Sequence, residues 1–503
     1  MSAPRYARLG LGGQPLETTS LTVDDLPVSG RLPEWLHGTL LRNGPGTFQV
    51  GRQRYRHWFD GLAMLHRFTI ADSRVSYANR FLESRSYDEA RATGRIAYSE
   101  FATDPCRSMF ARVQSMFDAS VTDSAKVNVA RLNDRFLALA ETPIQVEFDP
   151  ETLRSVGVMQ HEAGSYGRMT TVHPHTDPAT KDTYNLVTRF HASSEYRFYR
   201  STADLAWQRV AGQRVAQPAY LHSFGMSSRY LVLAEYPLVV NPMTLLLWLR
   251  PFIENFRWRP ERGARFVVFD RASGQRVLTR ETEAFFAFHH VNCFEDGDDL
   301  VVDLVCYPDA DVISAFYLER LHDPDVEIPF GQLRRYRLPL RRGKRPVSWE
   351  QIGQECLELP SYDYPRLVTD GLYRHVYGVS ISRDNRSGFY NQIVALDLQT
   401  RQERTWHAPD QFPGEPVFVG RPGRTAENDG VLLSVVLDVN RQASALLVLD
   451  AATLDEVARA DLPHPVLFGY HGLFVSERQG PSGAGPSSLE SRSSATRRRP
   501  PGR

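Results

Sequence analysis

The stretch FVVFDRASGQRV, residues 266–277, has the pattern of a tight β-hairpin. Its first half is rich in β-branched and aromatic residues, which favour strands, and a short polar turn begins at Asp270. The carboxylate of Asp270 is placed to accept hydrogen bonds from backbone N–H groups two residues further along the turn. The stretch therefore predicts two antiparallel strands joined by a short turn.

The same pattern recurs along the chain at irregular spacing. It is strong around Asp149, Asp397 and Asp450, in residues 144–156, 393–405 and 446–458, and weaker in residues 65–77 and 196–207. Repeated hairpins with insertions between them are typical of a β-propeller. A β-sandwich is the alternative, but hairpins spread over nearly the whole chain fit a sandwich poorly. We expect an all-β propeller.

The composition is that of a folded globule with no charge excess. Of the 503 residues, 42% are hydrophobic, and 59 Lys and Arg balance 59 Asp and Glu. Proteins whose main partner is nucleic acid usually show a basic excess, so we expect no nucleic acid partner. The four cysteines include no Cys-x-x-Cys pair. This argues against a thiolate zinc site and against a disulfide framework.

The ends of the chain predict one domain and a tail. The first residues, MSAPRYARLGLGGQPL, lack the pattern of a signal peptide, and no apolar run reaches the roughly 18 residues of a membrane span. We therefore expect a cytoplasmic protein. Residues 1–475 are predicted to form a single propeller domain. Residues 479–503 are rich in Gly, Ser, Pro and Arg and are expected to be disordered.

Two segments interrupt the β pattern. Residues 106–132 place Met109, Phe110, Val113, Met116 and Phe117 at helical spacing, which predicts an amphipathic helix. Residues 241–260 contain a dense apolar run. Each segment fits an ordinary core helix or a patch that docks on a membrane surface, and the residues alone leave both alternatives open.

Four of the 15 histidines lie in apolar surroundings close to predicted strand ends: His173, His222, His289 and His471. Imidazole suits iron, copper, zinc and nickel. The inner strands of a propeller start close together, so histidines from separate blades could converge on one metal ion. The alternative for each is a core histidine with ordinary hydrogen bonds.

Three glutamates also follow predicted strands and stand beside proline or turn residues: Glu141, Glu358 and Glu415. Metal-bound histidines usually donate their second N–H to a carboxylate or carbonyl, which sets the tautomer. The alternative for all three is an exposed position in a turn.

Seven blocks of sequence, taken together and in this order, resemble the carotenoid cleavage oxygenases from about residue 15 to about residue 475. These blocks are LRNGPGTF (41–48), HWFDGLAMLHRF (57–68), HPHTD (173–177), HSFGMS (222–227), FHHVNCFED (288–296), GEPVFVGRPG (414–423) and GYHG (469–472). The block SEFATDPCRSMF (99–110) is similar to the animal branch, which includes β-carotene cleavage enzymes and a retinoid isomerase.

The resemblance implies a seven-bladed propeller with a helical and loop cap over a central iron(II). By motif, the iron ligands fall on His173, His222, His289 and His471, and the carboxylates that orient them on Glu141, Glu358 and Glu415. His290, His175 and His464 fall outside the ligand set. One departure is SYDYP after Glu358, where the family often carries an Ile-Asn pair.

The resemblance also implies O₂-dependent scission of a conjugated C=C bond into two carbonyl fragments. The expected substrate is an apolar polyene, a carotenoid or apocarotenoid, drawn from a membrane surface into a tunnel lined by residues such as Phe101 and Phe288. Aromatic richness, as in AFFAF (284–288), predicts few polar groups in the tunnel and so disfavours a phenolic stilbene. The alternatives are a stilbene-type alkene, a retinoid isomerase, and a carotenoid-binding protein without turnover.

Overall fold

The computed structural model describes most of the chain. The described residues are 3–13, 15–16, 20–105, 122–160, 169–202, 206–246, 250–341, 345–364, 373–383 and 388–476. The predicted tail, residues 479–503, and residues 106–121 of the predicted amphipathic helix lie outside these ranges.

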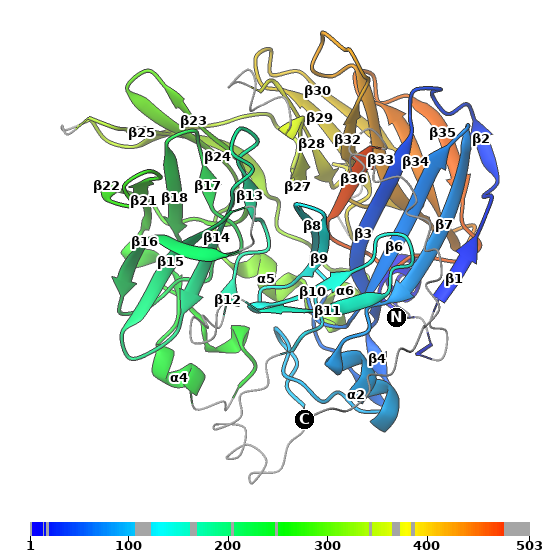
Figure 1. Ribbon diagram of the computed structural model, residues 1–503, viewed down its shortest axis with the longest axis horizontal. Helices are drawn as coiled ribbons and strands as arrows, with labels where there is room; N and C mark the ends of the chain where they lie inside the picture. Colours follow the sequence, from blue (N-terminus) through cyan, green and yellow to red (C-terminus); the bar gives the residue numbers. More distant parts are fainter. Residues whose placement is uncertain are drawn as a thin grey trace, which may run out of the picture.

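Seven antiparallel sheets stand around one axis as the blades of a propeller (Figure 1). The seven-bladed prediction is confirmed. In hydrogen-bonding order, the strands of the first four blades are as follows: blade I, β1 (Ser20–Val23), β7 (Arg74–Phe81), β6 (Leu62–Ala71), β3 (Gly38–Thr47), β36 (Gly472–Ser476); blade II, β11 (Ser155–Gln160), β10 (Ile144–Phe148), β9 (Arg135–Leu139), β8 (Asn128–Leu132); blade III, β12 (Met169–Thr170), β14 (Thr183–Arg189), β15 (Ser194–Ser201), β16 (Trp207–Val215), with β13 (His175–Thr176) beside β14; blade IV, β17 (Gly225–Met226), β18 (Tyr230–Glu235), β21 (Ala264–Asp270), β22 (Arg276–Thr282).

The remaining blades repeat this plan. Their strands are as follows: blade V, β23 (Phe286–Asp296), β24 (Asp299–Tyr307), β25 (Gln332–Pro339), β26 (Ser348–Gln351); blade VI, β27 (Glu358–Ser361), β28 (His375–Ser380), β29 (Gln392–Asp397), β30 (Glu403–His407); blade VII, β2 (Val28–Gly30), β35 (Glu456–Asp461), β34 (Ala443–Asp450), β33 (Gly430–Asp438), β31 (Gln411–Pro413), with β32 (Val417–Gly420) beside β33. Two small sheets pair β4 (Gln49–Val50) with β5 (Gln53–Arg54) and β19 (Leu238–Val239) with β20 (Arg257–Trp258).

The hairpins predicted from sequence are present, and the turn aspartates accept backbone N–H groups two or three residues further along. Residues 266–277 run from β21 into β22, and the backbone N–H of Ser273 donates to Oδ1 of Asp270 at 2.8 Å. The same contact recurs at Asp149, Asp397 and Asp450, whose Oδ1 atoms accept backbone N–H groups of their own turns. Local turn chemistry therefore repeats from blade to blade.

The two ends of the described chain close the ring. Strand β36, from the C-terminal end, pairs with β3 in blade I, and β2, from the N-terminal end, pairs with β35 in blade VII. In Figure 1 the red β36 lies directly beside the blue β3. The first and last blades are thus each built from both ends of the chain.

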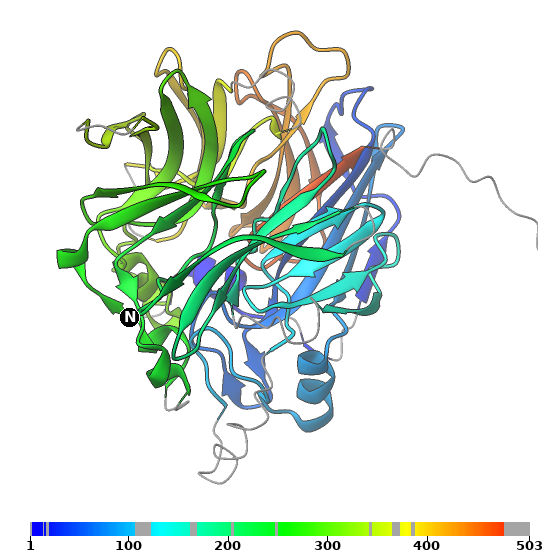
Figure 2. The same cartoon turned by 60° about the vertical axis from the view of Figure 1, so that its left-hand side comes forward.

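The helices are short and gather with loops toward one side of the ring, in the lower half of Figures 1 and 2. They are α1 (Arg5–Gly10), α2 (Arg85–Thr93), α4 (Pro242–Leu246), α5 (Asp311–Ala315), α6 (Leu318–Leu321) and the 3₁₀ turns η1 (Ile253–Asn255) and η2 (Pro260–Arg262). No helix within the described ranges combines the length and apolar character needed to cross a membrane.

Two helical expectations need correction. The predicted helical segment ended at Leu132, but Asn128–Leu132 is strand β8, where pairing with β9 in blade II outweighs the helical spacing. The segment 241–260 is not one helix either. It contains the five-residue α4, the turn η1 and the short strand β20, because β20 pairs with β19.

Candidate metal centre

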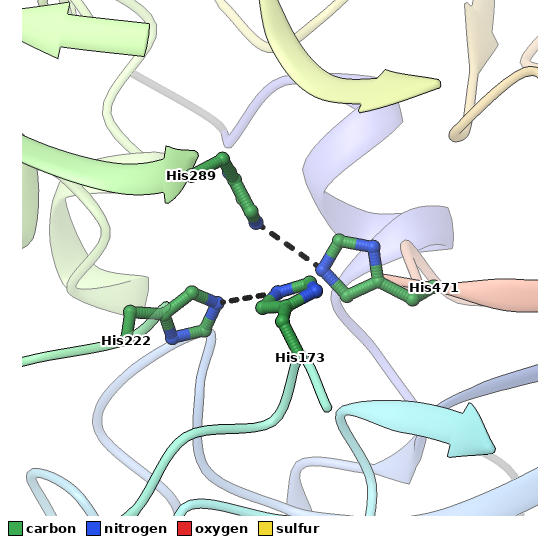
Figure 3. Close-up of side chains that lie close together, drawn as sticks. All are labelled: His173, His222, His289 and His471. Carbon is green, nitrogen blue, oxygen red and sulfur yellow. Dashed lines mark hydrogen bonds between the residues drawn. The ribbon is translucent and has the colours of Figure 1, made fainter. Parts of the chain in front are cut away.

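Four histidines from four blades meet on the propeller axis. His289 belongs to β23, His471 directly precedes β36, His222 lies shortly before β17, and His173 lies between β12 and β13. Their rings point toward one another (Figure 3), and one ring nitrogen of each lies within 4.8 Å of all the others. The Nε2 atoms of His173 and His222 are 3.3 Å apart, as are those of His289 and His471. Inner strands of separate blades therefore bring four imidazoles to one point.

Three of these histidines carry a carboxylate partner on the ring nitrogen that faces away from the centre. Glu141 follows β9, Glu358 is the first residue of β27, and Glu415 lies between β31 and β32. The three contacts are His222 Nδ1 to Glu141 Oε1 at 2.7 Å, His289 Nδ1 to Glu358 Oε2 at 2.6 Å, and His471 Nδ1 to Glu415 Oε1 at 2.7 Å. His173 has no such carboxylate among the described residues.

Burial keeps the imidazoles of His173, His222 and His471 neutral. It lowers the pKa of His173 well below the usual value, and the neighbouring rings, His471 first, act in the same direction. Burial also lowers the pKa of His222, although Glu141 opposes the shift. It lowers the pKa of His471 to about 4 against the opposing effect of Glu415. Near neutral pH these rings keep a nitrogen lone pair for a ligand bond.

Two of the carboxylates beside them, those of Glu358 and Glu415, are ionised. Burial alone would raise the pKa of Glu358, but His289 and hydrogen bonds to the carboxylate outweigh it and hold the pKa below its ordinary value. The pKa of Glu415 is likewise lowered, because His471 and Arg42 outweigh the effect of burial. An ionised carboxylate can only accept, so each Nδ1 donates its proton outward and Nε2 faces the centre unprotonated.

This donor set fits a divalent transition metal ion. Four imidazole nitrogens at one point match the ligands preferred by iron, copper, zinc and nickel, and the outward carboxylates are the usual partners of metal-bound histidines. The group of His173, His222, His289 and His471 could therefore bind a metal ion.

The other histidines near the axis have different partners. His290 Nδ1 lies 2.8 Å from the hydroxyl of Ser223, and His175 Nε2 lies 3.0 Å from the carbonyl oxygen of Phe224. His464 lies farther out, where its Nε2 is 3.4 Å from the side-chain amide of Asn79. None of the three belongs to the four-histidine group.

A cavity reaches the histidines, and its empty space, open solvent at the mouth included, is about 1380 Å³. Phe101 and Phe288, named from the sequence as tunnel residues, both line it. Phe59 joins them, with ring centroids 5.3 Å from Phe101 and 5.5 Å from Phe288. Trp58, Phe190, Phe252 and Phe316 also line the cavity, together with His222, His289 and His471. Most of its surface is apolar, and aromatic side chains supply much of it.

One polar feature of this wall was missed in the sequence. Lys126 Nζ lies 2.6 Å from Oε2 of Glu100, both side chains are buried, and both residues line the cavity. The hydroxyl of Thr122 donates to the other carboxylate oxygen. Burial raises the pKa of Glu100 to about 7, with Lys126 opposing the shift. The expectation of a tunnel with few polar groups is therefore incomplete. In the sequence, the one sign of a buried lysine is that Lys126 stands among small and apolar residues in SAKVNV.

Comparison with known proteins gives a consistent result across sequence and structure. The family described as retinal pigment epithelial membrane protein matches residues 14–476. The carotenoid isomerooxygenase of Galleria mellonella is 32% identical over 92% of this chain and 94% of its own length. The human β,β-carotene 15,15′-dioxygenase is 29% identical over 90% of this chain and 92% of its own length.

Solved structures agree. A variant of the apocarotenoid oxygenase of Synechocystis superposes with a TM-score of 0.84 at 26% identity, covering 94% of this chain and 99% of that one. The cobalt-substituted form of that oxygenase gives a TM-score of 0.83 with the same coverage. With its seven blades and axial histidines, the chain belongs to the retinal pigment epithelial membrane protein family, the family of the carotenoid oxygenases.

Proposed function

We propose that this protein is an iron(II)-dependent dioxygenase that cleaves one C=C bond of a carotenoid or apocarotenoid into two aldehyde products. One observation carries the proposal: four imidazoles converge, and three of them, those of His222, His289 and His471, line a cavity whose surface is mostly apolar. The relatives named as carotenoid dioxygenase and apocarotenoid oxygenase support the substrate class.

His173, His222, His289 and His471 would hold the iron, and Glu141, Glu358 and Glu415 would fix three of the ligand rings. When bound, iron(II) supplies the activation of O₂. The carboxylates keep Nε2 of each partner ring free of a proton and turned to the centre. No side chain then needs to act as a nucleophile or as an acid or base toward the substrate.

The cavity residues bind and orient the substrate. A polyene is apolar, and burying its surface contributes about 25 cal/mol per Å² removed from water. Edge-to-face aromatic rings such as Phe59 and Phe288 form a rigid wall, and they exclude water from the metal centre. Orientation then comes from the shape of the cavity, which holds one double bond beside the metal.

Oxygen labelling tests this proposal directly. Protein loaded with iron(II) without oxygen is given β-carotene or an apocarotenal and then exposed to ¹⁸O₂. We expect two shorter aldehydes that each carry one labelled atom, after correction for exchange with water. Protein that binds these polyenes and never shortens them in air would refute the dioxygenase and favour a binding protein. Chromatography of geometric isomers in the same samples reports any isomerase activity.

A second candidate substrate is a stilbene-type alkene, and the buried Glu100–Lys126 pair is the observation that favours it. An ammonium group in a cavity wall can hold a phenolic oxygen. Changing Glu100→Leu and Lys126→Met together removes the pair without leaving one buried charge alone. If the pair holds substrate, the KM for a hydroxystilbene rises about tenfold or more, and the KM for β-carotene stays unchanged.

We also propose that the protein docks on membranes near α4. Leu245, on α4, lines the cavity together with the neighbouring Pro251 and Phe252, and Met243 on α4 is 51% exposed. A cavity mouth beside an exposed apolar side chain would take an insoluble polyene directly from lipid. The predicted contribution of residues 106–121 lies outside the described ranges and stays a prediction.

A further inference from the structure

The ring of the propeller closes next to one of the four histidines. Strand β36 pairs with β3, and the innermost pair of that ladder is Arg42 with Gly472. One residue further, the backbone N–H of Asn43 donates to the carbonyl oxygen of His471 at 3.1 Å, and the N–H of Tyr470 donates to Asn43 at 3.2 Å. The backbone of His471 is therefore held by strand β3, more than 400 residues earlier in the chain.

The side chain of Arg42 connects the paired strands β3 and β36 to Glu415, the carboxylate beside His471. Its Nη1 donates to Oε2 of Glu415 at 2.6 Å, and its Nη2 donates to the carbonyl oxygen of Tyr470 at 2.9 Å. Arg42 and Glu415 are both buried, with side chains 6% and 8% exposed. One guanidinium thus joins blade I, blade VII and the residue before His471.

Glu415 is fully engaged by these contacts. Its Oε1 accepts the Nδ1–H of His471 at 2.7 Å, and its Oε2 accepts both Arg42 and the backbone N–H of Gly472 at 2.9 Å. Because the planar guanidinium has donors in fixed directions, it sets the plane of the carboxylate. That plane in turn sets the ring of His471.

The other two carboxylates are supported differently. Glu141 accepts the hydroxyl of Tyr220, and Glu358 accepts the hydroxyl of Tyr307 at 2.8 Å. Within the described ranges neither forms an ion pair with a lysine or arginine. Among the residues that the structure describes, Arg42 is therefore the one lysine or arginine that touches a carboxylate of the centre, and it acts on the histidine at the ring closure.

We infer that Arg42 is a positioning residue of the metal centre, which holds His471 in place through Glu415 and Tyr470 and so makes metal binding depend on closure of the ring. The inference rests on the proposed metal centre. A buried ion pair broken on one side leaves an uncompensated charge, so loss of Arg42 should displace Glu415 and with it the ring of His471. Loss of such an outer partner typically lowers metal affinity by about 10–100-fold.

Cobalt(II) is the probe, because its binding and absorption spectrum can be measured without turnover. Affinity is measured by competition with a chelator in full-length wild type, Arg42→Met, Arg42→Lys, His471→Ala and the double variant Arg42→Met/His471→Ala. We expect about 10–100-fold weaker binding and an altered spectrum in Arg42→Met. The double variant should bind about as His471→Ala does, because Arg42 acts through that ring.

Arg335→Met is the matched control. Arg335 forms a two-point pair with the buried Asp303, at 2.8 and 2.7 Å, between β24 and β25, and this pair contacts none of the four histidines or their carboxylates. This change should lower the thermal midpoint of the metal-free protein and leave cobalt affinity and spectrum unchanged.

Each result of these measurements either supports the inference about Arg42 or overturns it. Wild-type affinity and spectrum in folded Arg42→Met overturn the inference and leave the metal centre standing. If Arg42→Met does not fold, Arg42→Lys decides instead: lysine is shorter and has one nitrogen in place of the two that contact Glu415 and Tyr470, so affinity should still fall, and wild-type binding overturns the inference. A wild-type protein that binds no cobalt(II) overturns the proposed metal centre, and the inference with it.

Discussion

Nδ1 of His289 lies 2.6 Å from Oε2 of Glu358, across the boundary between blades V and VI. The same carboxylate accepts the backbone N–H of Leu359 at 2.9 Å and the hydroxyl of Tyr307 at 2.8 Å. Both oxygens of Glu358 are thus held by neighbours, so the carboxylate cannot turn away from His289. The relative position of two blades sets the orientation of this imidazole.

Glu358→Gln should therefore lower iron affinity and turnover by about 10–100-fold. The glutamine amide has no charge and one acceptor oxygen, so it cannot accept from His289 and Tyr307 on separate oxygens as the carboxylate does. Bound iron and initial rates are measured after equilibration with limiting iron(II). Glu355→Gln is the control, since Glu355 pairs with Arg383 away from the histidines. Equal iron content in both variants would contradict this role.

The two adjacent histidines of β23 should respond in opposite ways. His289→Ala should lose most bound iron and all activity, because one of four ligands is gone. His290→Ala should keep its iron, because His290 hydrogen-bonds Ser223 and lies outside the four-histidine group. Metal analysis of both purified variants checks this, and full iron content in His289→Ala would disprove the assignment.

Substrate affinity should depend on Phe101, which lines the cavity and lies with its ring centroid 5.3 Å from Phe59. Phe101→Ala removes apolar contact with the substrate. Because this contact is the same in the bound complex and in the transition state, KM should rise about tenfold and kcat should change little. Phe418→Ala is the control, because Phe418 stacks on Tyr377 between blades VI and VII. A fall in kcat alone would argue against a role in binding.

Acid should destabilise the metal-free protein partly through His57. Burial lowers the pKa of His57 from 6.5 to about 3, against an opposing hydrogen bond to the Ile313 carbonyl. In the unfolded chain His57 therefore binds a proton below pH 6.5, whereas in the folded chain it binds one only below about pH 3. Stability is lost as pH falls through this window, by about 1.4 kcal/mol per pH unit from this group.

Urea unfolding from about pH 7 to about pH 5 measures that slope. His57→Gln should be less stable at neutral pH, because it loses the contacts of the ring, but its stability should fall less steeply with acid. His191→Gln, a change at an exposed histidine, should keep the wild-type slope. An unchanged slope in His57→Gln would assign the acid sensitivity to other buried groups.

Met243→Ser should weaken binding to lipid vesicles if the surface near α4 docks on membranes. Met243 is 51% exposed, so the change removes apolar surface without opening the core. Co-sedimentation with liposomes measures binding, and Val277→Ser, at an exposed apolar residue in blade IV, is the control. Equal sedimentation of both variants and wild type would place the docking surface elsewhere.

Much of the fold was readable from local patterns. The turn after Asp270 and its counterparts at Asp149, Asp397 and Asp450 predicted hairpins, because a turn aspartate acts on its own neighbours in sequence. The block FHHVNCFED, with its resemblance to a known family, was enough to name His289 ahead of His290. Both inferences needed only residues close together in the chain.

Other features depended on partners far away in sequence. Residues 128–132 were at the end of the segment predicted as a helix, and pairing with β9 decided that they form a strand. Lys126 can line the cavity because the carboxylate of Glu100 balances the charge of its ammonium group in the interior. Neither outcome follows from a local pattern.

The sequence by itself determined that the chain forms repeated antiparallel hairpins and carries four histidines able to serve as metal ligands. Only the tertiary structure decided how those histidines are held. Arg42 and His471 meet through Glu415 because β36 returns to β3 and closes the ring. This contact depends on the geometry of all seven blades. Each blade is rotated relative to the one before it about the propeller axis, and the two ends of the chain meet only when these rotations complete the ring.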